Sequence, residues 1–339
     1  IAIGRKSTAS QTSAIALGDS GTASGAQAIA IGESSLASGT NSTAIGFGTK
    51  ATGTNDYASG TGATASGGLS TAIGYKAYAS GGGNDATGGV SASAIAIGYE
   101  ARAVSQDVGN TAIAIGNKAT AIKSGIAIGY DSKAPQDGAI ALGWQADATN
   151  SLSGVAIGDR AKATGNNAIA IGGNPNNTAT QAIGNGAMAV GSGSKATGVG
   201  TVALGGLGGT AGGSVADKDF AVAIGAAALA TNIGAVAIGG DDKNLAKASG
   251  KNSVAIGSKT QALGENSLAF GMGSSAGTTG SIAVGVNSSA SGEGSVVIGN
   301  ANKAPNKNTF ILGNGIQSTQ DNSVILGNAS TDSVATKET

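Results

Sequence analysis

The side chains that most often carry acid–base, nucleophilic or metal chemistry are absent from this chain. It contains no His and no Cys, so a Ser–His or Cys–His pair for nucleophilic catalysis cannot form. The absence of His also removes the commonest general base and the commonest metal ligand. We therefore expect no catalytic site, no cofactor and no metal, and we expect the protein not to be an enzyme.

Two glycine-containing patterns could in principle bind phosphates or ions, and neither is specific. Strings similar to Gly-x-Gly-x-x-Gly arise by chance in a chain with 61 glycines, and no helical pattern follows them. The segment Gly81-Gly82-Gly83-Asn84-Asp85 resembles a calcium-binding solenoid repeat, but it occurs as a single copy.

Charge and composition narrow the class of protein. Lys plus Arg and Asp plus Glu each number 19, so the chain has no net charge to attract nucleic acid. Aromatic residues make up only 3%, which leaves few large side chains for an ordinary globular core. The apolar residues are mostly Ala, Ile and Val, which suit thin β-sheets.

A repeat of fourteen residues organises the chain. An apolar segment ending in glycine recurs at this interval from Gly4 to Gly46, and again without interruption from Gly257 to Gly327. Each repeat holds two stretches of period-two alternation, the first like Ala-Ile-Ala-Ile-Gly and the second like Ala-x-Ala-x-Gly. The pattern predicts an all-β solenoid, a flattened roll with two short strands per coil. Turn-forming Asn precedes the first strand at Asn41, Asn110, Asn252, Asn266, Asn308 and Asn322.

The two strands differ in which faces are apolar. In the second strand, Ala161 and Ala163 should face inward while Lys162 and Thr164 face solvent. The first strand is apolar on both faces, and we expect its Ile or Val side chains to fill the roll. The residues expected inside are Ile29, Ile31, Val254 and Ile256.

The alternate positions of the first strand are Ala, and we expect them to face outward. A sheet that is apolar on both faces is normally covered on both, so this outer face predicts side-by-side oligomerisation. The alternative is that Ala merely tolerates exposure to solvent. The residues expected at the interface between chains are Ala30, Ala170, Ala237 and Ala255.

Departures from the regular repeat suggest where a partner binds. Four intervals between strand-ending glycines are longer than fourteen residues and predict projecting loops: Gly74–Gly98, Gly98–Gly116, Gly205–Gly225 and Gly239–Gly257. We expect the polar segment 206–220, with Asp217, Lys218 and Asp219, to contact a partner. Neutral variation in loop sequence is the alternative.

Two exposed rows of side chains are further candidates. The residue after the strand-ending glycine is aromatic at Phe47, Tyr75, Tyr99, Tyr130 and Trp144, and aromatic side chains are favoured interface anchors. The middle of the second strand is often basic, as at Lys162 and Lys195. The alternatives are that the rings cover glycine-rich corners and that the lysines keep the strands soluble.

These motifs resemble the heads of trimeric autotransporter adhesins, a family typified by the Yersinia adhesin YadA. The family motif Asn-Ser-Val-Ala-Ile-Gly occurs unchanged at Asn252–Gly257, with variants at Asn266–Gly271 and Asn322–Gly327. The resemblance covers essentially the whole chain. Among the members of the family, the glycine-rich repeats are most similar to the ubiquitous surface protein A adhesins of Moraxella.

The resemblance implies a left-handed parallel β-roll that forms a homotrimer on the surface of a bacterial outer membrane. Residues 1–327 would form the head, and residues 328–339 would begin a neck or linker toward a stalk and membrane anchor beyond this chain. The implied partners are host extracellular-matrix proteins, such as fibronectin, laminin or collagen, and receptors on host cells.

Other functions fit the repeat less well but stay open. The head could be a structural spacer that projects other binding domains from the cell surface. An ice-binding solenoid would need a more regular Thr ladder. A polysaccharide-cleaving β-helix usually has longer coils and clustered Arg, Lys and Asp.

Overall fold

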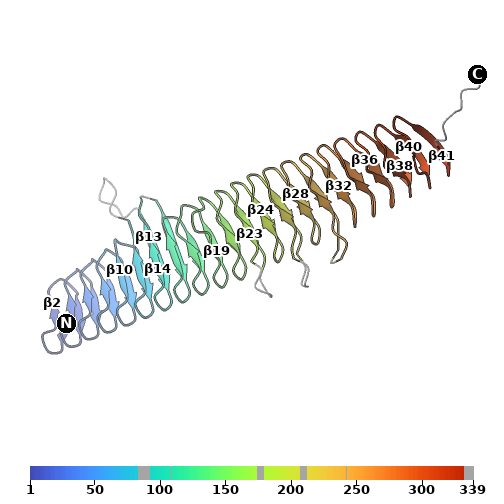
Figure 1. Cartoon of the computed structure of the whole chain (residues 1–339). Coiled ribbons are helices and arrows are strands. Elements are labelled where there is room, and N and C mark those ends of the chain that lie inside the picture. Colours follow the sequence, from blue (N-terminus) through green and yellow to red (C-terminus); the bar gives the residue numbers. More distant parts are fainter. Residues whose placement is uncertain (83–91, 108, 174–178, 207–211, 242, 332–339) are drawn as a thin grey trace, which may run out of the picture. The chain divides into compact units, whose positions relative to one another are not determined.

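The computed structural model describes residues 1–331 except 83–91, 108, 174–178, 207–211 and 242. Every element in this part of the chain is a β-strand, and most consecutive strands alternate between two facing sides of the roll (Figure 1). We call the sheet formed by the first strand of each coil sheet A and the sheet formed by the second strand sheet B. Sheet A contains 22 strands among the described residues. The predicted all-β roll with two parallel strands per coil is confirmed.

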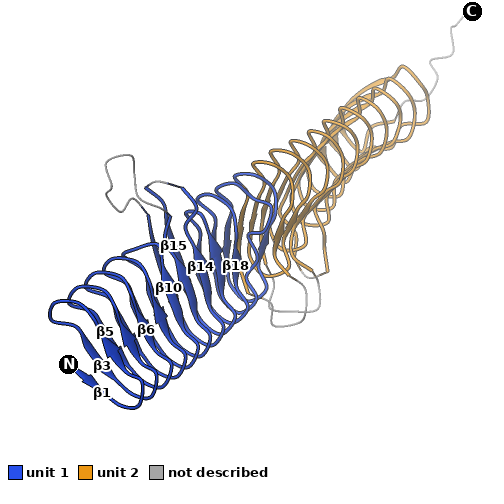
Figure 2. Ribbon diagram, turned by 90° about the vertical axis from the view of Figure 1, so that its left-hand side faces the viewer, with its two compact units in different colours: residues 1–167 blue, residues 168–339 orange. Residues whose placement is uncertain are grey.

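The chain divides into two compact units, residues 1–167 and residues 168–339 (Figure 2). In the first unit, sheet A consists of β1 (Ala2–Ile3), β3 (Ile15–Leu17), β5 (Ile29–Ile31), β7 (Thr43–Ile45), β9 (Tyr57–Ser59), β11 (Thr71–Ile73), β13 (Ser93–Ile97), β15 (Thr111–Ile115), β17 (Ile126–Ile128), β19 (Ile140–Leu142) and β20 (Val155–Ile157). The strands of its sheet B are β2 (Thr8–Ala9), β4 (Thr22–Ala23), β6 (Leu36–Ala37), β8 (Lys50–Ala51), β10 (Thr64–Ser66), β12 (Tyr78–Ser80), β14 (Arg102–Val104), β16 (Thr120–Ile122), β18 (Lys133–Ala134) and β21 (Lys162–Ala163).

The second unit repeats the same arrangement. Its sheet A consists of β22 (Ile169–Ile171), β24 (Met188–Val190), β26 (Val202–Leu204), β28 (Val222–Ile224), β30 (Val236–Ile238), β32 (Val254–Ile256), β34 (Leu268–Phe270), β36 (Ile282–Val284), β38 (Val296–Asn300), β40 (Phe310–Asn314) and β41 (Val324–Asn328). The strands of its sheet B are β23 (Gln181–Ala182), β25 (Lys195–Ala196), β27 (Val215–Ala216), β29 (Leu229–Ala230), β31 (Lys247–Ala248), β33 (Gln261–Ala262), β35 (Ser275–Ala276), β37 (Ser289–Ala290) and β39 (Lys303–Ala304).

Strand pairing keeps equivalent repeat positions side by side. Ala30 pairs with Ala44, fourteen residues later in the chain, and all neighbouring strands run parallel. The register survives the longer intervals, because Ala72 in β11 still pairs with Ala96 in β13. The longer interval therefore does not disturb the ladder, as expected for an insertion in a solenoid.

Residues with positive φ make the tight turns that the period requires. Gly32 ends its strand at φ 128°, and a Cβ atom there would lie 2.4 Å from the carbonyl oxygen of Gly46. No other residue fits such a position without strain. Asn41 and Asn252 have φ values of 57° and 54° in the turn before sheet A, which confirms the turns predicted there.

The roll is filled by alanine, and here the sequence-based expectation is wrong. Ala30, Ala170, Ala237 and Ala255 have no solvent exposure within the single chain, whereas Ile31 is 36% exposed and Ile29, Val254 and Ile256 are only half-buried. Period-two alternation separates two faces but does not say which one points inward. Coils of fourteen residues hold the two sheets so close that methyl groups fill the space between them.

Small hydroxyl side chains complete the interior beside the alanines. Ser253 and Ser267 are buried, and each donates to a turn carbonyl, that of Gly250 and that of Gly264, at 2.7 Å. Because the partner is a carbonyl of the same coil, the hydroxyls are buried without losing their hydrogen bonds. The predicted inward positions Ala161 and Ala163 are also fully buried, while Lys162 is exposed, which confirms the assignment for sheet B.

The largest fully buried side chains of the described residues lie near the end of the roll. Val297 and Ile311 occupy the alanine position of β38 and β40, and Ile316 is buried beside them. Asn302 is also buried there, where it donates to the carbonyl of Gly313 at 2.7 Å and accepts from the Ile316 amide at 2.9 Å. The last coils are therefore packed differently from the rest. The proposed boundary between a head ending at residue 327 and a neck beginning at 328 stays a prediction.

Candidate binding surfaces

The outward side of sheet A carries two parallel rows of apolar side chains in each unit, which we call the apolar face. The face follows from the repeat, because the residues on both sides of each buried Ala point out of the roll. In the second unit the rows contain, among others, Val236, Ile238, Val254, Ile256, Leu268 and Phe270. In the first unit they are interrupted by polar residues at Thr43, Tyr57, Ser59 and Thr71.

This face is open to solvent in the single chain. Ile73, Ile128 and Ile171 are 37%, 40% and 38% exposed, and Phe270 is 49% exposed. A parallel sheet is normally covered on both faces, and continuous apolar patches of this kind mark sites of association. The surface available to a neighbouring chain is therefore the Ile and Val rows. The assignment of Ala30, Ala170, Ala237 and Ala255 to that interface is wrong, because their side chains are enclosed by their own chain.

The predicted basic residues occupy outward positions of sheet B, one in each unit. Lys162 and Lys195 are both exposed and lie on β21 and β25. Lys133 and Lys162 are separated by Asp147, which bridges to both strands, and Lys195 lies between Gln181 and Val215. Among the described residues, acidic or neutral side chains thus lie beside each of the two lysines, so neither belongs to a continuous basic stripe.

The segment 206–220 contains less inserted loop than the sequence suggests. Residues 207–211 lie outside the described part of the chain. Val215 and Ala216 form β27, and Asp217–Phe220 make the ordinary turn between sheets B and A. The carboxylate of Asp217 accepts from the Thr197 hydroxyl at 2.8 Å, and that of Asp219 accepts from the Val199 amide at 2.9 Å.

The placement of Asp217, Lys218 and Asp219 in a projecting loop is therefore wrong, because backbone hydrogen bonds hold them in register with the neighbouring coils. All three are nevertheless exposed, so they remain accessible to a partner. The extra residues that distinguish this interval come before Ser214. The calcium-like segment 81–85 falls largely outside the described residues, which include only Gly81 and Gly82.

The first residue after each strand-ending glycine lies on one edge of the roll, and we call this edge in the first unit the aromatic column. Tyr99, Tyr130 and Trp144 are 45%, 44% and 41% exposed. Tyr75 stacks on Tyr99 with ring centroids 5.1 Å apart, and Tyr130 stacks on Trp144 at 6.0 Å. The rings therefore cover one another in pairs and leave edges and outer faces accessible.

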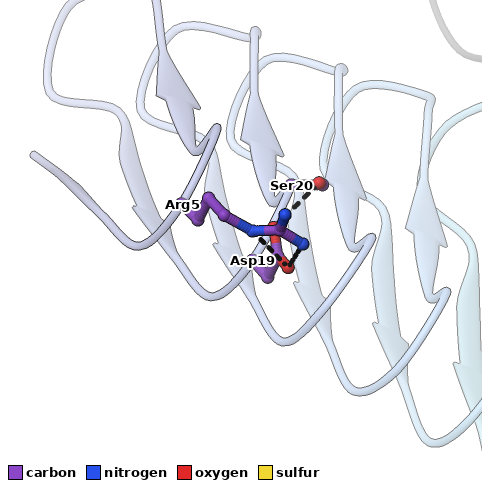
Figure 3. Close-up of polar contacts among 3 residues, drawn as sticks. All are labelled: Arg5, Asp19 and Ser20. Atoms are coloured by element: carbon purple, nitrogen blue, oxygen red, sulfur yellow. Dashed lines mark hydrogen bonds and ion pairs between the residues drawn. The ribbon is translucent and has the colours of Figure 1, made fainter.

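The same edge carries charges in the earliest coils (Figure 3). Arg5 contacts Asp19 at 2.6 Å across neighbouring coils, and the hydroxyl of Ser20 donates to the other carboxylate oxygen of Asp19 at 3.0 Å. Arg5 is 76% exposed, so this ion pair contributes little to stability, about 0–1 kcal/mol. The same backbone position thus carries charged side chains in the earliest coils and aromatic side chains in later ones.

Among the described residues, no group of three or more acidic side chains could hold a metal ion. The one buried carboxylate among the residues described is Asp56, which accepts from the Gly53 amide at 2.6 Å and the Ser70 amide at 3.0 Å. Burial raises the pKa of Asp56 above its ordinary value, and the backbone donors only partly oppose that shift. No helix in this part of the chain is long and apolar enough to cross a membrane.

These features define a class of protein: a parallel β-roll repeat protein with one uncovered apolar face and variable edges. The YadA head domain repeat matches residues 1–20, 23–49, 51–77, 65–87, 91–119, 123–146, 150–174, 182–207, 216–241, 248–274 and 279–302. The chain belongs to the YadA head family and is an adhesin-type head of a trimeric autotransporter. A comparison with curated proteins gave no match.

Proposed function

We propose that this chain is the head of a bacterial surface adhesin that binds host extracellular-matrix proteins, such as fibronectin, laminin or collagen, and receptors on host cells. The observation that carries the proposal is the YadA head repeat along the chain. The head acts by binding alone, without catalysis, a cofactor or nucleic acid. It is displayed at the outer membrane of the bacterium.

Three copies of the chain cover the apolar face. The half-exposed rows that include Ile238 and Ile256 give each copy a long apolar surface, and a neighbouring copy provides one of matching composition. This arrangement would remove apolar area from water along both units, at roughly 25 cal/mol for each Å² buried. The interface then consists of Ile, Val and Leu, with the alanines behind it inside each roll.

The surfaces left for a host protein are the outer side of sheet B and the edges of the roll. Lys162 and Lys195 lie on the first of these surfaces, and Tyr99, Tyr130 and Trp144 lie on an edge. Asp217, Lys218 and Asp219 lie on the turn that leads back to sheet A. Each contact would be weak, but three copies per trimer and many trimers per cell raise the effective concentration.

Solid-phase binding of the purified head to immobilised fibronectin, laminin and collagen tests the proposal. We expect saturable binding to at least one of them that decreases as salt or soluble ligand is added. The variant Lys162→Ala with Lys195→Ala tests the basic residues: it should fold normally and bind less. If the trimeric head binds none of the three proteins and no host cells, the chain is a spacer that projects other domains.

The similarity to the ubiquitous surface protein A adhesins belongs to this proposal as well. It rests on the glycine-rich repeats and would be supported if the head bound the same matrix proteins as those adhesins in a parallel assay.

A further inference from the structure

We propose that the aromatic column binds an arginine side chain of a partner protein, inserted between the rings of Tyr99 and Tyr130 above Asn117. The inference deepens the proposed adhesive function and rests on it, because it supplies the chemistry of one contact with a host protein. It concerns the first unit alone.

Backbone hydrogen bonds place Asn117 directly between the two tyrosines. The Lys118 amide donates to the carbonyl of Tyr99 at 2.8 Å, and the Asp131 amide donates to the carbonyl of Asn117 at 2.8 Å. Tyr99, Asn117 and Tyr130 therefore occupy the same edge position in three successive coils. Neighbouring strands lie about 4.7–4.9 Å apart, so the two tyrosines are separated by roughly 9.5 Å along the stack.

That separation suits one planar group. Carbon atoms in contact lie about 3.5–4.0 Å apart, so a flat group stacked against both rings needs about 7–8 Å. Asn117 is exposed and much smaller than the rings on either side. It is the position where the column of Tyr75, Tyr99, Tyr130 and Trp144 lacks a ring.

The other face of each tyrosine already has a partner. Tyr99 stacks on Tyr75 with its plane tilted by 16°, and Tyr130 stacks on Trp144 with its plane tilted by 17°. The far face of Trp144 is covered in turn by Arg160, whose guanidinium carbon lies 4.4 Å from the ring centroid. The faces of Tyr99 and Tyr130 that point toward Asn117 are thus the ones left, and in the described part of the chain no cation lies over either ring.

The neighbouring chemistry favours a cation as the guest. Three aromatic rings of this unit already have a cation of the chain over them: Lys76 over Tyr75, Arg102 over Tyr78 and Arg160 over Trp144. Electron-rich ring faces attract cations, and the planar guanidinium of Arg stacks while its N–H groups bond to acceptors at its edge.

Carboxylates flank the site on both sides. Glu100 and Asp131 follow the two tyrosines directly in sequence, and Lys118 follows Asn117. Asp131 also contacts Lys133 at 3.6 Å. Glu100 and Asp131 therefore offer carboxylate oxygens as acceptors for a guanidinium, although Lys133 already neutralises part of the charge on Asp131.

The aromatic side chains of the column are not required for association between copies of the chain. The column's position is charged at Arg5, Asp19 and Glu33, yet the apolar face of sheet A runs through these coils and the aromatic ones alike. A contact needed to hold copies of the chain together would not change from charges to rings while that face stays the same. The rings are therefore free to make a contact other than packing between copies.

The test compares two substitutions at one residue. Asn117→Phe fills the space between Tyr99 and Tyr130 with a ring, and Phe already occurs at this repeat position as Phe47. Asn117→Ala leaves that space open. The probe is N-acetyl-arginine amide, titrated into the whole chain while the ring signals of its tyrosines are followed by NMR. N-acetyl-citrulline amide, which is planar but uncharged, is the matched control ligand.

We expect the arginine probe to shift the signals of Tyr99 and Tyr130, and citrulline to bind at least about tenfold more weakly. Asn117→Phe should weaken arginine binding by at least about tenfold, and Asn117→Ala should retain it. Equal binding of citrulline, or unchanged binding by Asn117→Phe, would overturn the proposal. So would a methyl glycoside that shifts the same signals more strongly than arginine, because it would indicate a glycan site.

Two further measurements distinguish an arginine site from a contact between copies and from the proposed binding of matrix proteins. If Asn117→Phe changes the oligomeric mass in light scattering, the edge is a contact between copies and the proposal is wrong. Binding to matrix proteins is measured separately on the unsubstituted head. A head that binds the arginine probe but no matrix protein would contradict the proposed function while leaving the arginine site intact.

Discussion

Ala255 in β32 pairs in register with Ala269 in β34, and neither side chain has any solvent exposure. Their methyl groups lie in the narrow space between sheets A and B, where a larger side chain would force the sheets apart. We predict that Ala255→Leu destabilises the roll by about 1–3 kcal/mol. Thermal unfolding followed by circular dichroism measures the effect.

Ile256→Leu is the matched control for that substitution, since Ile256 adjoins Ala255 but lies on the half-exposed side of the sheet. It should change the midpoint of unfolding by much less. If the two substitutions were equally damaging, alanine would not be required for the spacing of the sheets.

Substitution of a strand-ending glycine should destabilise the roll far more than substitution of a glycine in the turn that follows it. Gly32 has φ 128° and no room for a Cβ atom, whereas Gly48 has φ 61° and open space around it. We predict that Gly32→Ala destabilises the roll by at least about 1–3 kcal/mol, from backbone strain alone. Gly48→Asn should be nearly neutral, because Asn tolerates the left-handed conformation. Comparing the unfolding midpoints of the two variants checks this prediction.

Much of the fold follows from the spacing of the glycines. The interval from Gly257 to Gly271 fixes a coil, and alternation around Ala255 fixes which side chains share a face. The direction of that face does not follow, because Ala and Ile are both apolar and either could be placed inside. The thickness of the interior decides between them, and it depends on how both turns close in three dimensions.

The candidate surfaces were predictable in part. The exposed positions of Tyr99 and Lys162 follow from the variety of residues found at equivalent repeat positions. The stacking of Tyr130 on Trp144 depends on the coil spacing, which converts a recurrence along the sequence into a contact. The place of Asp217 was missed because extra glycines before it concealed the short strand at Val215–Ala216.

Asp56 should make the stability of the roll depend on pH. It occupies a position that holds Ser42 and Ser70 in the adjacent coils, and burial raises its pKa. A group whose pKa is higher in the folded state contributes stability that is fully present below its unfolded pKa, about 3.9, and is lost as pH rises through the folded value. Asp56→Ser should remove this component.

The comparison between Asp56→Ser and the unsubstituted chain is made by thermal unfolding at several pH values between about 3 and 7. We expect the substituted chain to gain stability relative to the original as the pH rises from about 3.9 through the folded pKa of Asp56, and the difference to stay constant above it. A difference that stays constant over this range would mean that Asp56 has the same pKa in both states.

The apolar face should control assembly without controlling the fold of each chain. Ile238 and Ile256 are paired on neighbouring strands and half-buried in the single chain, so Lys at both positions can still reach solvent in a monomer. In a trimer the two ammonium groups would be buried without partners, which is strongly unfavourable. We predict that Ile238→Lys with Ile256→Lys converts the trimer to monomers in light scattering, while circular dichroism keeps its β-sheet spectrum. Gln261→Lys, in the same coil but exposed on sheet B, should leave the trimer unchanged. A trimer that tolerates both lysines on sheet A would show that the copies meet through another surface.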